Sequence, residues 1–410
     1  MSIRFRLAGI IGNFLGHYDS ALFTLLAPFI APLFFDGQDP LTALILTYAI
    51  LPLGFITRPL GSLFFGWVGD RWGRKHSLFC SLLGMAFITV GVGCLPLYKQ
   101  VGIWAPIGLA LGRMLQNFCA AGESTGGALF ILEHTPTKQR SIMSSFYGVS
   151  VICGYLIASG LVTWMSMQGM VEEGWRVLFW LGGLTGILGV FLRWKTEDAE
   201  EFVRQKRTGL LTTLKENKGT LGAILLAAGF SYTTYSLPFT LMNGYIPLVS
   251  SLTKVDVMQV NTLLLIIDML LLPCFGYLIH KLGKEKVMMA AASVLVVGAI
   301  PLFALLDHAS FAMMIAIRLA IVTMGVAFSA PYHAWALERV PPEHRYTILC
   351  VGYSLGSQLI GTPAPAVCLW IYQKMGWVWA PGLYLMGAAL AAFLVVRYYA
   401  RAAIPSPAKL

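Results

Sequence analysis

The stretch "GWVGDRWGRKHSL" at residues 66–78 decides the fold, because it returns in altered form in the second half of the chain. Its counterpart is "GYLIHKLGKEKVM" at residues 276–288, and both follow the plan Gly-x-x-x-[polar]-[basic]-x-Gly-[basic]. A second pair of segments, "LEHTPTKQR" (132–140) and "LERVPPEHR" (337–345), shares the pattern Leu-Glu-x-x-Pro-x-x-x-Arg. Two motifs repeated in the same order predict two related halves, an arrangement that places a substrate site between them.

The segments around these motifs have the composition of a membrane protein. Apolar residues make up 57% of the 410 residues, and charged residues only 12%, whereas soluble domains carry about 25% charged residues. Apolar runs of 18 or more residues, each long enough to cross a hydrocarbon core of about 30 Å as a helix, recur from end to end. The sequence therefore predicts an all-α polytopic membrane protein.

We expect twelve transmembrane helices in two pseudo-symmetric bundles of six. The predicted spans are 8–34, 42–69, 77–97, 102–132, 141–167, 175–194, 219–249, 256–280, 286–306, 309–337, 345–372 and 377–400. The one long loop, between the sixth and seventh spans, is rich in charged residues. It divides the chain into an N-terminal bundle (1–194), a cytoplasmic linker (195–218) and a C-terminal bundle (219–410).

The distribution of the 29 lysines and arginines predicts the orientation of the chain. Most of them fall in loops on the same side as the N-terminus, whereas the opposite loops contain only Lys99, Lys254 and Lys374. By the positive-inside rule, both termini are cytoplasmic, in a bacterial-type inner (plasma) membrane. The net charge of +10 is thus explained by topology and by lipid headgroups. We expect membrane lipid and a small-molecule solute as partners, no nucleic acid, and a monomer.

The sequence contains no complete enzyme motif. A P-loop is missing, so ATP does not drive the protein, and the Glu-His pairs at 133–134 and 343–344 lack the HExxH spacing of a zinc site. The seven cysteines are scattered through apolar stretches without a CxxC pair. We expect a protein that is not an enzyme, with no metal and no cofactor, and with protons as the coupling ion.

The stretch "GDRWGRK" after the second span resembles the signature loop of the major facilitator superfamily, and the longer "FITRPLGSLFFGWVGDRWGRK" (55–75) is similar to its metabolite:proton symporter branch. The segments "GRMLQNFCAAGESTGGALFILEHTPTKQR" (112–140) and "PYHAWALERVPPEHRYTILCVGYSLGSQLIGTPAPAV" (331–367) are similar to the same branch. That branch includes proline/betaine, shikimate, α-ketoglutarate and citrate carriers. The resemblance covers the whole chain and implies the major facilitator fold, with alternating access to a central site.

The first span departs from the pattern of that branch. Where the branch usually reads Gly-Asn-x-x-Glu-Trp-Tyr-Asp-Phe, this chain reads "GNFLGHYDS" (12–20). Gly16 and His17 replace the Glu-Trp pair, and Ser20 replaces the Phe. The wall of the cavity near the first span is therefore altered, so osmolyte or citrate specificity does not transfer directly.

Ionisable residues within the spans are the candidates for proton coupling, because a charge at the bilayer centre costs roughly 2.5–3.5 kcal/mol and is kept for a function. We expect Asp19 or Glu123 to carry the proton, with Arg113 as its partner. The resemblance to the family's acid in span 1 and arginine in span 4 favours Asp19 and Arg113. A static salt bridge that fixes helix packing is the alternative.

Helical spacing separates the polar residues of the first span into two faces. Asn13, His17, Ser20 and Thr24 recur at intervals of four, three and four and form one polar stripe. Asp19 points about 200° away from His17 at 100° per residue. We therefore expect His17 to face the central cavity and Asp19 to face other helices of the N-terminal half.

The remaining candidates for substrate binding come from both halves. Arg58 contacts a substrate anion or braces span 1, and Asp268 and Arg318 are the lone acid and lone base deep in the C-terminal half, where they could pair. An aromatic stripe on span 7 either packs or binds. The full set of candidates is Asn13, His17, Ser20, Arg58, Gln116, Tyr232, Tyr235, Phe239, Asn243, Asn261, Asp268, Arg318, Tyr353 and Gln358.

The resemblance to the family implies that the charged residues of the first repeated loop form a cytoplasmic gate. The charges would latch the helices in the outward-facing state, and plain solvation of the loops is the alternative. In the second copy, His280 and Lys281 replace Asp70 and Arg71. The predicted gate residues are Gly66, Asp70, Arg71, Gly73, Arg74, Glu133 and Arg140.

These observations predict a secondary active transporter that takes up a small polar or carboxylate-bearing solute with protons. Cations at Arg58, Arg113 and Arg318 favour a carboxylate over a neutral sugar. One alternative is a proton-driven exporter of a siderophore-like carboxylate or a drug. An alternative of another class is a membrane receptor or scaffold that no longer transports.

Overall fold

The computed structural model describes residues 3–72, 74–121, 140–194, 214–340 and 345–401. The side chains of some residues near the ends of these segments are outside the description. Every described span is helical, and no strand occurs in these ranges. The prediction of an all-α chain is confirmed.

The helices of the N-terminal half follow one another with short connections. They are α1 (Ile3–Phe34), α2 (Pro40–Ala49), the 3₁₀ turn η1 (Leu51–Leu53), α3 (Gly54–Trp72), α4 (Arg74–Gly93), α5 (Tyr98–Val101), α6 (Trp104–Ala120), α8 (Arg140–Met167) and α9 (Val171–Trp194).

The C-terminal half repeats this plan. Its elements are α11 (Lys218–Ser236), the π-helical turn η3 (Leu237–Leu241), α12 (Met242–Val249), α13 (Lys254–Leu282), α14 (Lys284–Ala304), α15 (Phe311–Ser329), α16 (Tyr332–Leu337), α17 (Arg345–Gly356), the π-helical turn η5 (Ser357–Gly361), α18 (Ala364–Met375) and α19 (Pro381–Arg401).

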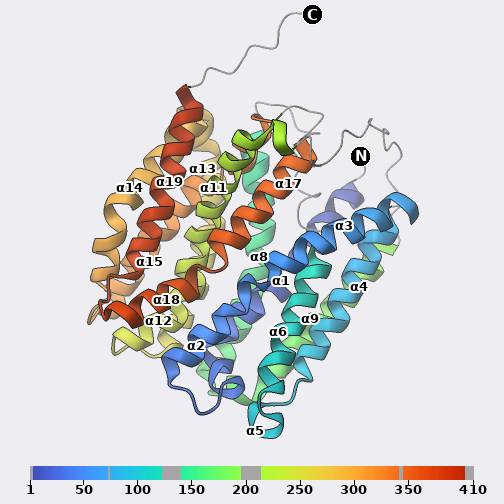
Figure 1. Ribbon diagram of the computed structural model, residues 1–410, viewed down its shortest axis with the longest axis vertical. Coiled ribbons are helices and arrows are strands. Elements are labelled where there is room, and N and C mark those ends of the chain that lie inside the picture. Colours follow the sequence, from blue (N-terminus) through green and yellow to red (C-terminus); the bar gives the residue numbers. More distant parts are fainter. Residues whose placement is uncertain (1–2, 73, 122–139, 195–213, 341–344, 402–410) are drawn as a thin grey trace, which may run out of the picture.

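The helices run along the long axis of the molecule, with α14 and α19 at one side and α3 and α4 at the other (Figure 1). The short elements α5 and α12 lie at the end opposite to the one where α19 finishes (Figure 1). Helix α8 of the first half packs along α13 of the second half, and α2 packs against α18. These two seams join the halves.

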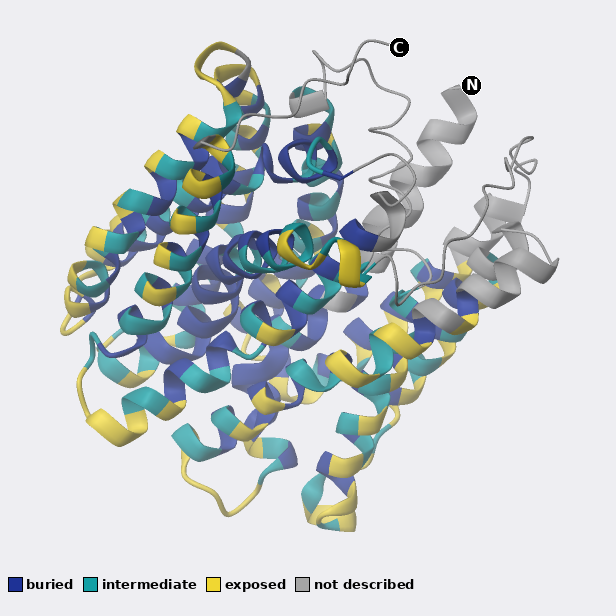
Figure 2. Ribbon diagram, turned by 45° about the horizontal axis from the view of Figure 1, so that its top comes forward, coloured by how far each residue is buried: buried dark blue, intermediate teal, exposed yellow. Residues whose placement is uncertain are grey.

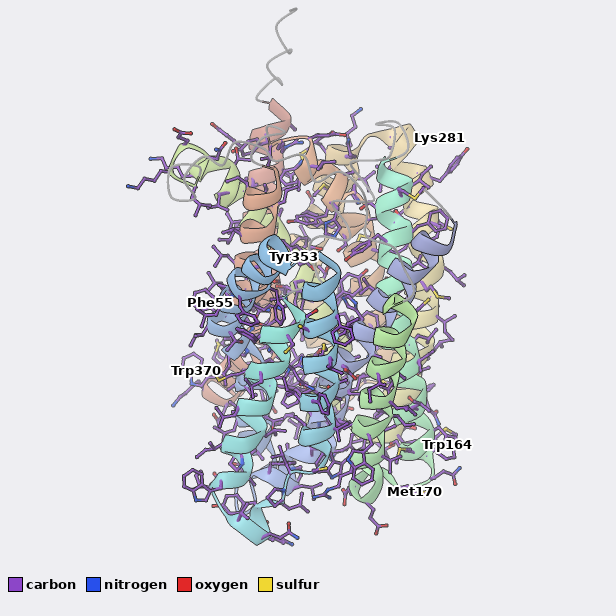
Figure 3. The ribbon with its side chains drawn as sticks, turned by 90° about the vertical axis from the view of Figure 1, so that its right-hand side faces the viewer. Phe55, Trp164, Met170, Lys281, Tyr353 and Trp370 are labelled. Atoms are coloured by element: carbon purple, nitrogen blue, oxygen red, sulfur yellow. The ribbon has the colours of Figure 1, made fainter. Side chains whose placement is uncertain are left out.

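The outer surface is apolar, as expected of helices that face lipid. Trp164, Trp370 and Phe55 project from the outside of the molecule (Figure 3) and are 58%, 52% and 40% exposed. Six helical segments of the described chain are long and apolar enough to cross a membrane. Buried residues concentrate between the helices (Figure 2). The outside of the molecule is apolar and parts of its interior are polar, which reverses the usual pattern of a soluble protein.

Several spans that the sequence predicts as continuous helices are interrupted. The second span is broken by η1, the seventh by η3, the tenth between α15 and α16, and the eleventh by η5. In η3 the amide of Met242 donates to the carbonyl of Leu237, and in η5 Thr362 donates to Ser357, five residues back in each case. Proline residues stand in or beside all four interruptions. Proline interrupts a helix because it lacks an amide donor and its ring clashes with the preceding turn.

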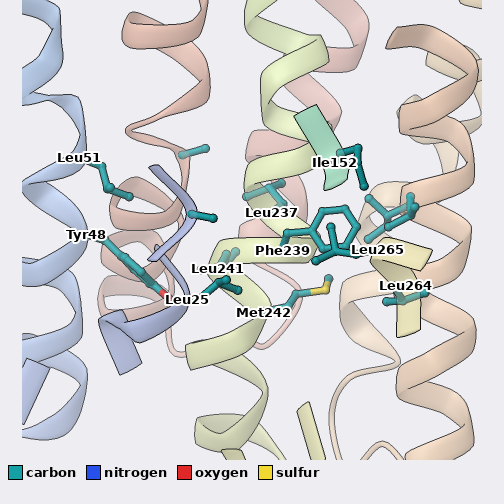
Figure 4. Close-up of a cluster of buried hydrophobic side chains, with 14 of the residues drawn as sticks. Leu25, Tyr48, Leu51, Ile152, Leu237, Phe239, Leu241, Met242, Leu264 and Leu265 are labelled. Carbon is teal, nitrogen blue, oxygen red and sulfur yellow. The ribbon is translucent and has the colours of Figure 1, made fainter. Parts of the chain in front are cut away.

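The halves are sealed together at the end opposite the termini. Tyr48 of α2 donates its hydroxyl to the carbonyl of Thr240 at 2.7 Å, and Lys254 donates to the carbonyl of Pro28 at 2.8 Å. An apolar cluster from both halves surrounds the first of these contacts and includes Leu25 and Leu51 of one half and Leu241 of the other (Figure 4). The cluster excludes water, so the bond of Tyr48 is stronger than it would be at an exposed surface.

Candidate functional site

A chain of hydrogen bonds joins the predicted proton-coupling residues of the N-terminal half. Thr89 of α4 donates its hydroxyl to Oδ2 of Asp19 on α1 at 3.1 Å. Gln116 of α6 donates from Nε2 to the Thr89 hydroxyl at 3.0 Å and accepts from Nη1 of Arg113 at 3.2 Å. Asp19 and Arg113 are 3% and 8% exposed. The acid and the base therefore belong to one buried network that spans three helices.

The glycine at position 182 of helix α9 leaves room for the side chain of Asp19. A Cβ atom at position 182 would lie only 2.2 Å from Oδ1 of Asp19, so the side chain occupies space that any residue other than glycine would fill. Arg113 lies on the opposite part of the network, with its guanidinium 5.2 Å from the centre of the Phe23 ring. The ring face is a favourable neighbour for a cation in an apolar interior.

His17 and Asp19 lie on different faces of α1, as the helical spacing predicted. Asp19 faces α4 and α9, both from the N-terminal half. His17 is half-buried and faces Tyr155 of α8, with 6.4 Å between the ring centres. Because α8 forms the seam with the C-terminal half, His17 is directed toward the interface of the bundles.

Side chains from both halves meet at this interface. Tyr155 interacts electrostatically with Arg58 and Arg113 of its own half and with Tyr232 and Tyr353 of the other half. Tyr353 in turn interacts with Arg58. Arg58 and the three tyrosines are half-buried, so they keep accessible surface. Two cations and a group of phenols thus gather between the bundles, where a solute could contact both.

The acid of the C-terminal half lies beside this group. Asp268 on α13 is fully buried, and its Oδ1 accepts a 3.3 Å hydrogen bond from the Tyr235 hydroxyl on α11. Tyr235 stacks on Phe239, with 6.0 Å between ring centres and 23° between the planes. Of the aromatic stripe predicted on span 7, Tyr232 interacts with Tyr155 of the other half. Tyr235 instead contacts Asp268 and Phe239 of its own half.

Asp268 and Arg318 do not pair in this structure, and the geometry of Arg318 explains why. The guanidinium is completely buried and donates to the carbonyls of Val257 and Pro238 and to the side-chain oxygens of Asn243 and Asn261, at 2.6–3.1 Å. All four acceptors are uncharged groups of the protein itself. Arg318, Asn243 and Asn261 thus form a structural hub, and this placement opposes the substrate contact that the sequence suggested for them.

One further amide of the predicted site, Gln358, lies where the halves touch. A Cβ atom at Gly54 would lie 2.8 Å from Oε1 of Gln358 and 2.9 Å from Nδ2 of Asn117. Gly54 starts α3, Asn117 belongs to α6 and Gln358 to η5 of the other half. Gln358 is therefore an interface residue, and it is 4% exposed.

Part of the predicted site falls outside the described residues. Glu123, Glu133 and Gly73 lie in segments that the structure does not describe. The backbone is described for a further set whose side-chain surroundings are not: Asn13, Ser20, Gly66, Asp70, Arg71, Arg74 and Arg140. The gate of the N-terminal half therefore stays a prediction.

In the C-terminal half, two ion pairs join the corresponding loop to the residues that follow α16. Lys284 pairs with Glu338, and Arg339 donates to Glu285 at 2.9 Å. In the register of the two repeats, Lys284 corresponds to Arg74 and Glu338 to Glu133. The second copy has no acid at position 280 and uses Glu285 as its second acid instead.

Two residues of the site were not predicted from the sequence. Thr89 connects Asp19 to Gln116, and Tyr155 connects His17 to the cations. Each is an isolated polar group in an apolar span, which was the available signal. Among the described residues, no group of three His, Cys, Asp or Glu side chains could hold a metal ion.

The sequence and the fold match known proteins over nearly their whole length. The model of the Major Facilitator Superfamily matches residues 10–250 and 224–410. A putative proline/betaine transporter of Staphylococcus aureus (strain COL) is 29% identical over 409 residues, which cover 95% of this chain and 86% of the relative. A proline/betaine transporter of Salmonella typhimurium is 27% identical over 403 residues, covering 93% and 80%.

Among solved structures, the inward open conformation of the xylose transporter XylE from E. coli has a TM-score of 0.72 at 15% identity. The match covers 98% of this chain and 96% of that chain and shows a common fold of twelve spans. Because the family model matches the chain from residue 10 to its end, this protein belongs to the Major Facilitator Superfamily.

Proposed function

We propose that this protein takes up a small carboxylate-bearing solute together with protons, by alternating access to a site between its two bundles. Relatives named as proline/betaine transporters and a fold neighbour named as a D-xylose-proton symporter support this reaction class. With both termini in the cytoplasm, the contacts of Tyr48 and Lys254 close the outer side of the membrane.

The observation that carries the proposal is the buried chain Asp19–Thr89–Gln116–Arg113 beside the interface. A carboxyl group in a low-dielectric interior exchanges a proton when its surroundings change from wet to dry. A deprotonated Asp19 neutralises the charge of Arg113, whereas a protonated Asp19 does not. The net charge of the network therefore differs between the two protonation states of Asp19. Proton binding at Asp19 is thereby coupled to the charge that Arg113 offers at the interface.

The interface cations define the end of the solute that binds there. Arg58 keeps accessible surface, and its guanidinium can form paired hydrogen bonds with a carboxylate. Tyr155, Tyr232 and Tyr353 surround it with ring faces and hydroxyl groups. The binding of a solute that touches both halves favours their closure around it, which is the step that alternating access requires.

Uptake into right-side-out vesicles that contain the protein tests this proposal, with radiolabelled proline and glycine betaine as the probes. A pH gradient, acidic outside, is expected to drive accumulation above equilibrium, and a protonophore is expected to abolish it. Accumulation only in inverted vesicles would identify an exporter instead. Binding of either solute without flux under any gradient would favour the receptor alternative.

A further inference from the structure

Asp268 is a buried acid whose second oxygen is unused. It is 0% exposed, and its Oδ1 accepts from Tyr235 at 3.3 Å. Its Oδ2 is also buried and has no hydrogen-bond partner in the described part of the chain. Most buried carboxylates in proteins are paired or fully hydrogen-bonded, because an isolated charge in a low-dielectric medium is very costly. This carboxyl group therefore needs either a bound proton or a positively charged partner.

The protein's own cations do not supply that partner. Arg318 is the one buried lysine or arginine of the described C-terminal half, and its donors are directed to four uncharged acceptors. No ion pair of Asp268 occurs among those of the described residues. Arg58 and Arg113, the cations of the interface, belong to the other half.

A row of phenols leads from Asp268 to those cations. Tyr235 binds Asp268 and interacts electrostatically with Tyr353, and Tyr353 interacts with Tyr232 and Arg58. Tyr232, Tyr235 and Tyr353 keep accessible surface, whereas Asp268 has none. The acid therefore belongs to one half and the cations to the other, and members of the tyrosine group interact with each.

We infer that Asp268 and Tyr235 form the subsite for the positively charged ammonium group of a zwitterionic solute, whose carboxylate binds on the Arg58 side. The inference rests on the proposed function and names the substrate class of that same site. The ring faces of Tyr235 and Tyr353 attract a cation, and the carboxylate of Asp268 supplies the opposite charge next to Tyr235. A dipolar solute then contacts each half with the end that the half attracts.

Two probes of the same shape isolate the ammonium charge. Glycine betaine and 3,3-dimethylbutanoate differ by a single atom, since a quaternary carbon replaces the quaternary nitrogen and removes the positive charge. Equilibrium binding of each is measured on the purified wild-type protein, on Asp268→Asn, on Tyr235→Phe and on Asp307→Asn. Asp307 is an exposed acid of the same half and serves as the matched control.

The wild type and Asp307→Asn are expected to bind glycine betaine more tightly than its uncharged-headgroup analogue. Asp268→Asn is expected to lose at least about thirtyfold in affinity for glycine betaine, as when one partner of a buried charge pair is truncated. The same variant should bind 3,3-dimethylbutanoate as well as the wild type does. Tyr235→Phe, which keeps the ring, is expected to weaken glycine betaine binding by a smaller factor.

The inference fails if Asp268→Asn keeps the wild-type preference for glycine betaine, or if the wild type binds neither probe. A variant that keeps the preference but loses proton-driven accumulation would assign Asp268 to proton transfer instead. A wild type that accumulates 3,3-dimethylbutanoate with protons as well as glycine betaine would also overturn the ammonium subsite. That last result would leave the proposed function intact, because carboxylate symport would still occur.

Discussion

Nη2 of Arg318 lies 2.6 Å from the carbonyl oxygen of Pro238, at the interruption of the seventh span. In an α-helix this carbonyl would accept from the amide of Met242, four residues later. In η3 the Met242 amide donates to Leu237 instead, so the π-helical turn releases the Pro238 carbonyl. Arg318 from the tenth span supplies the missing donor. The π turn and the arginine therefore depend on each other, and together they hold the backbone that presents Tyr235 and Phe239.

We expect Arg318→Met to destabilise the protein by about 3–5 kcal/mol, because the change strands four buried acceptors at once. Thermal unfolding of the detergent-purified protein measures the effect. Arg397→Met is the matched control, since Arg397 is exposed and lies over the Phe393 ring. An unfolding temperature within experimental error of that control would show that Arg318 does not hold the hub.

The sequence predicts the spans and the separate faces of the first helix well, because hydrophobic length and helical period are local properties. It places His17 and Asp19 on different faces of that helix, and the structure shows His17 beside Tyr155 of α8 and Asp19 beside Thr89 of α4. The partners of Arg318 were beyond such reasoning. They are backbone carbonyls and amides that come together only when three spans pack, and a released carbonyl leaves no trace in the residue pattern.

The same limit applies to Thr89. A threonine in an apolar span commonly bonds to its own helix backbone, as Thr47 does with the carbonyl of Ala43. Only the packing of α1, α4 and α6 shows that Thr89 instead bridges Asp19 and Gln116. Single polar residues in apolar spans are therefore ambiguous until the neighbouring helices are known.

Proton coupling is expected to depend on Asp19 and, less strongly, on Thr89. Asp19→Asn keeps the shape of the side chain and removes the exchangeable charge, so proton-driven accumulation of proline should be abolished while solute exchange without a gradient continues. Thr89→Val removes the bridge to Gln116 and should reduce accumulation partially. Asp307→Asn is the control. Wild-type accumulation by Asp19→Asn, at any imposed pH gradient, would remove Asp19 from the mechanism.

The two halves are expected to pack less well when a Cβ atom is added at Gly54. Gly54→Ala places a Cβ atom 2.8–2.9 Å from the side chains of Gln358 and Asn117, an overpacking that costs about 1–3 kcal/mol. The transport rate should therefore fall, and Gln358→Ala in the same chain should restore part of it by removing one clashing group. Gly91→Ala is the matched control, because nothing lies within 4 Å of its added Cβ atom. Equal rates for the two alanine variants would show that the interface yields at no cost.

The seal at the end opposite the termini is expected to open in every transport cycle. Gly244 approaches Leu44 so closely that an added Cβ atom would lie 2.5 Å from the leucine side chain, and Tyr48 bonds to Thr240 nearby. Replacing both Leu44 and Gly244 by cysteine, in a chain without other cysteines, should permit a disulfide across the two halves. Oxidation should then stop proline uptake, and reduction should restore it, because a covalent link prevents the halves from separating at this end. Each single cysteine variant controls for the substitutions alone. Uptake that continues at its full rate in the cross-linked protein would mean that this contact persists throughout transport, and that alternating access works by movements elsewhere in the molecule.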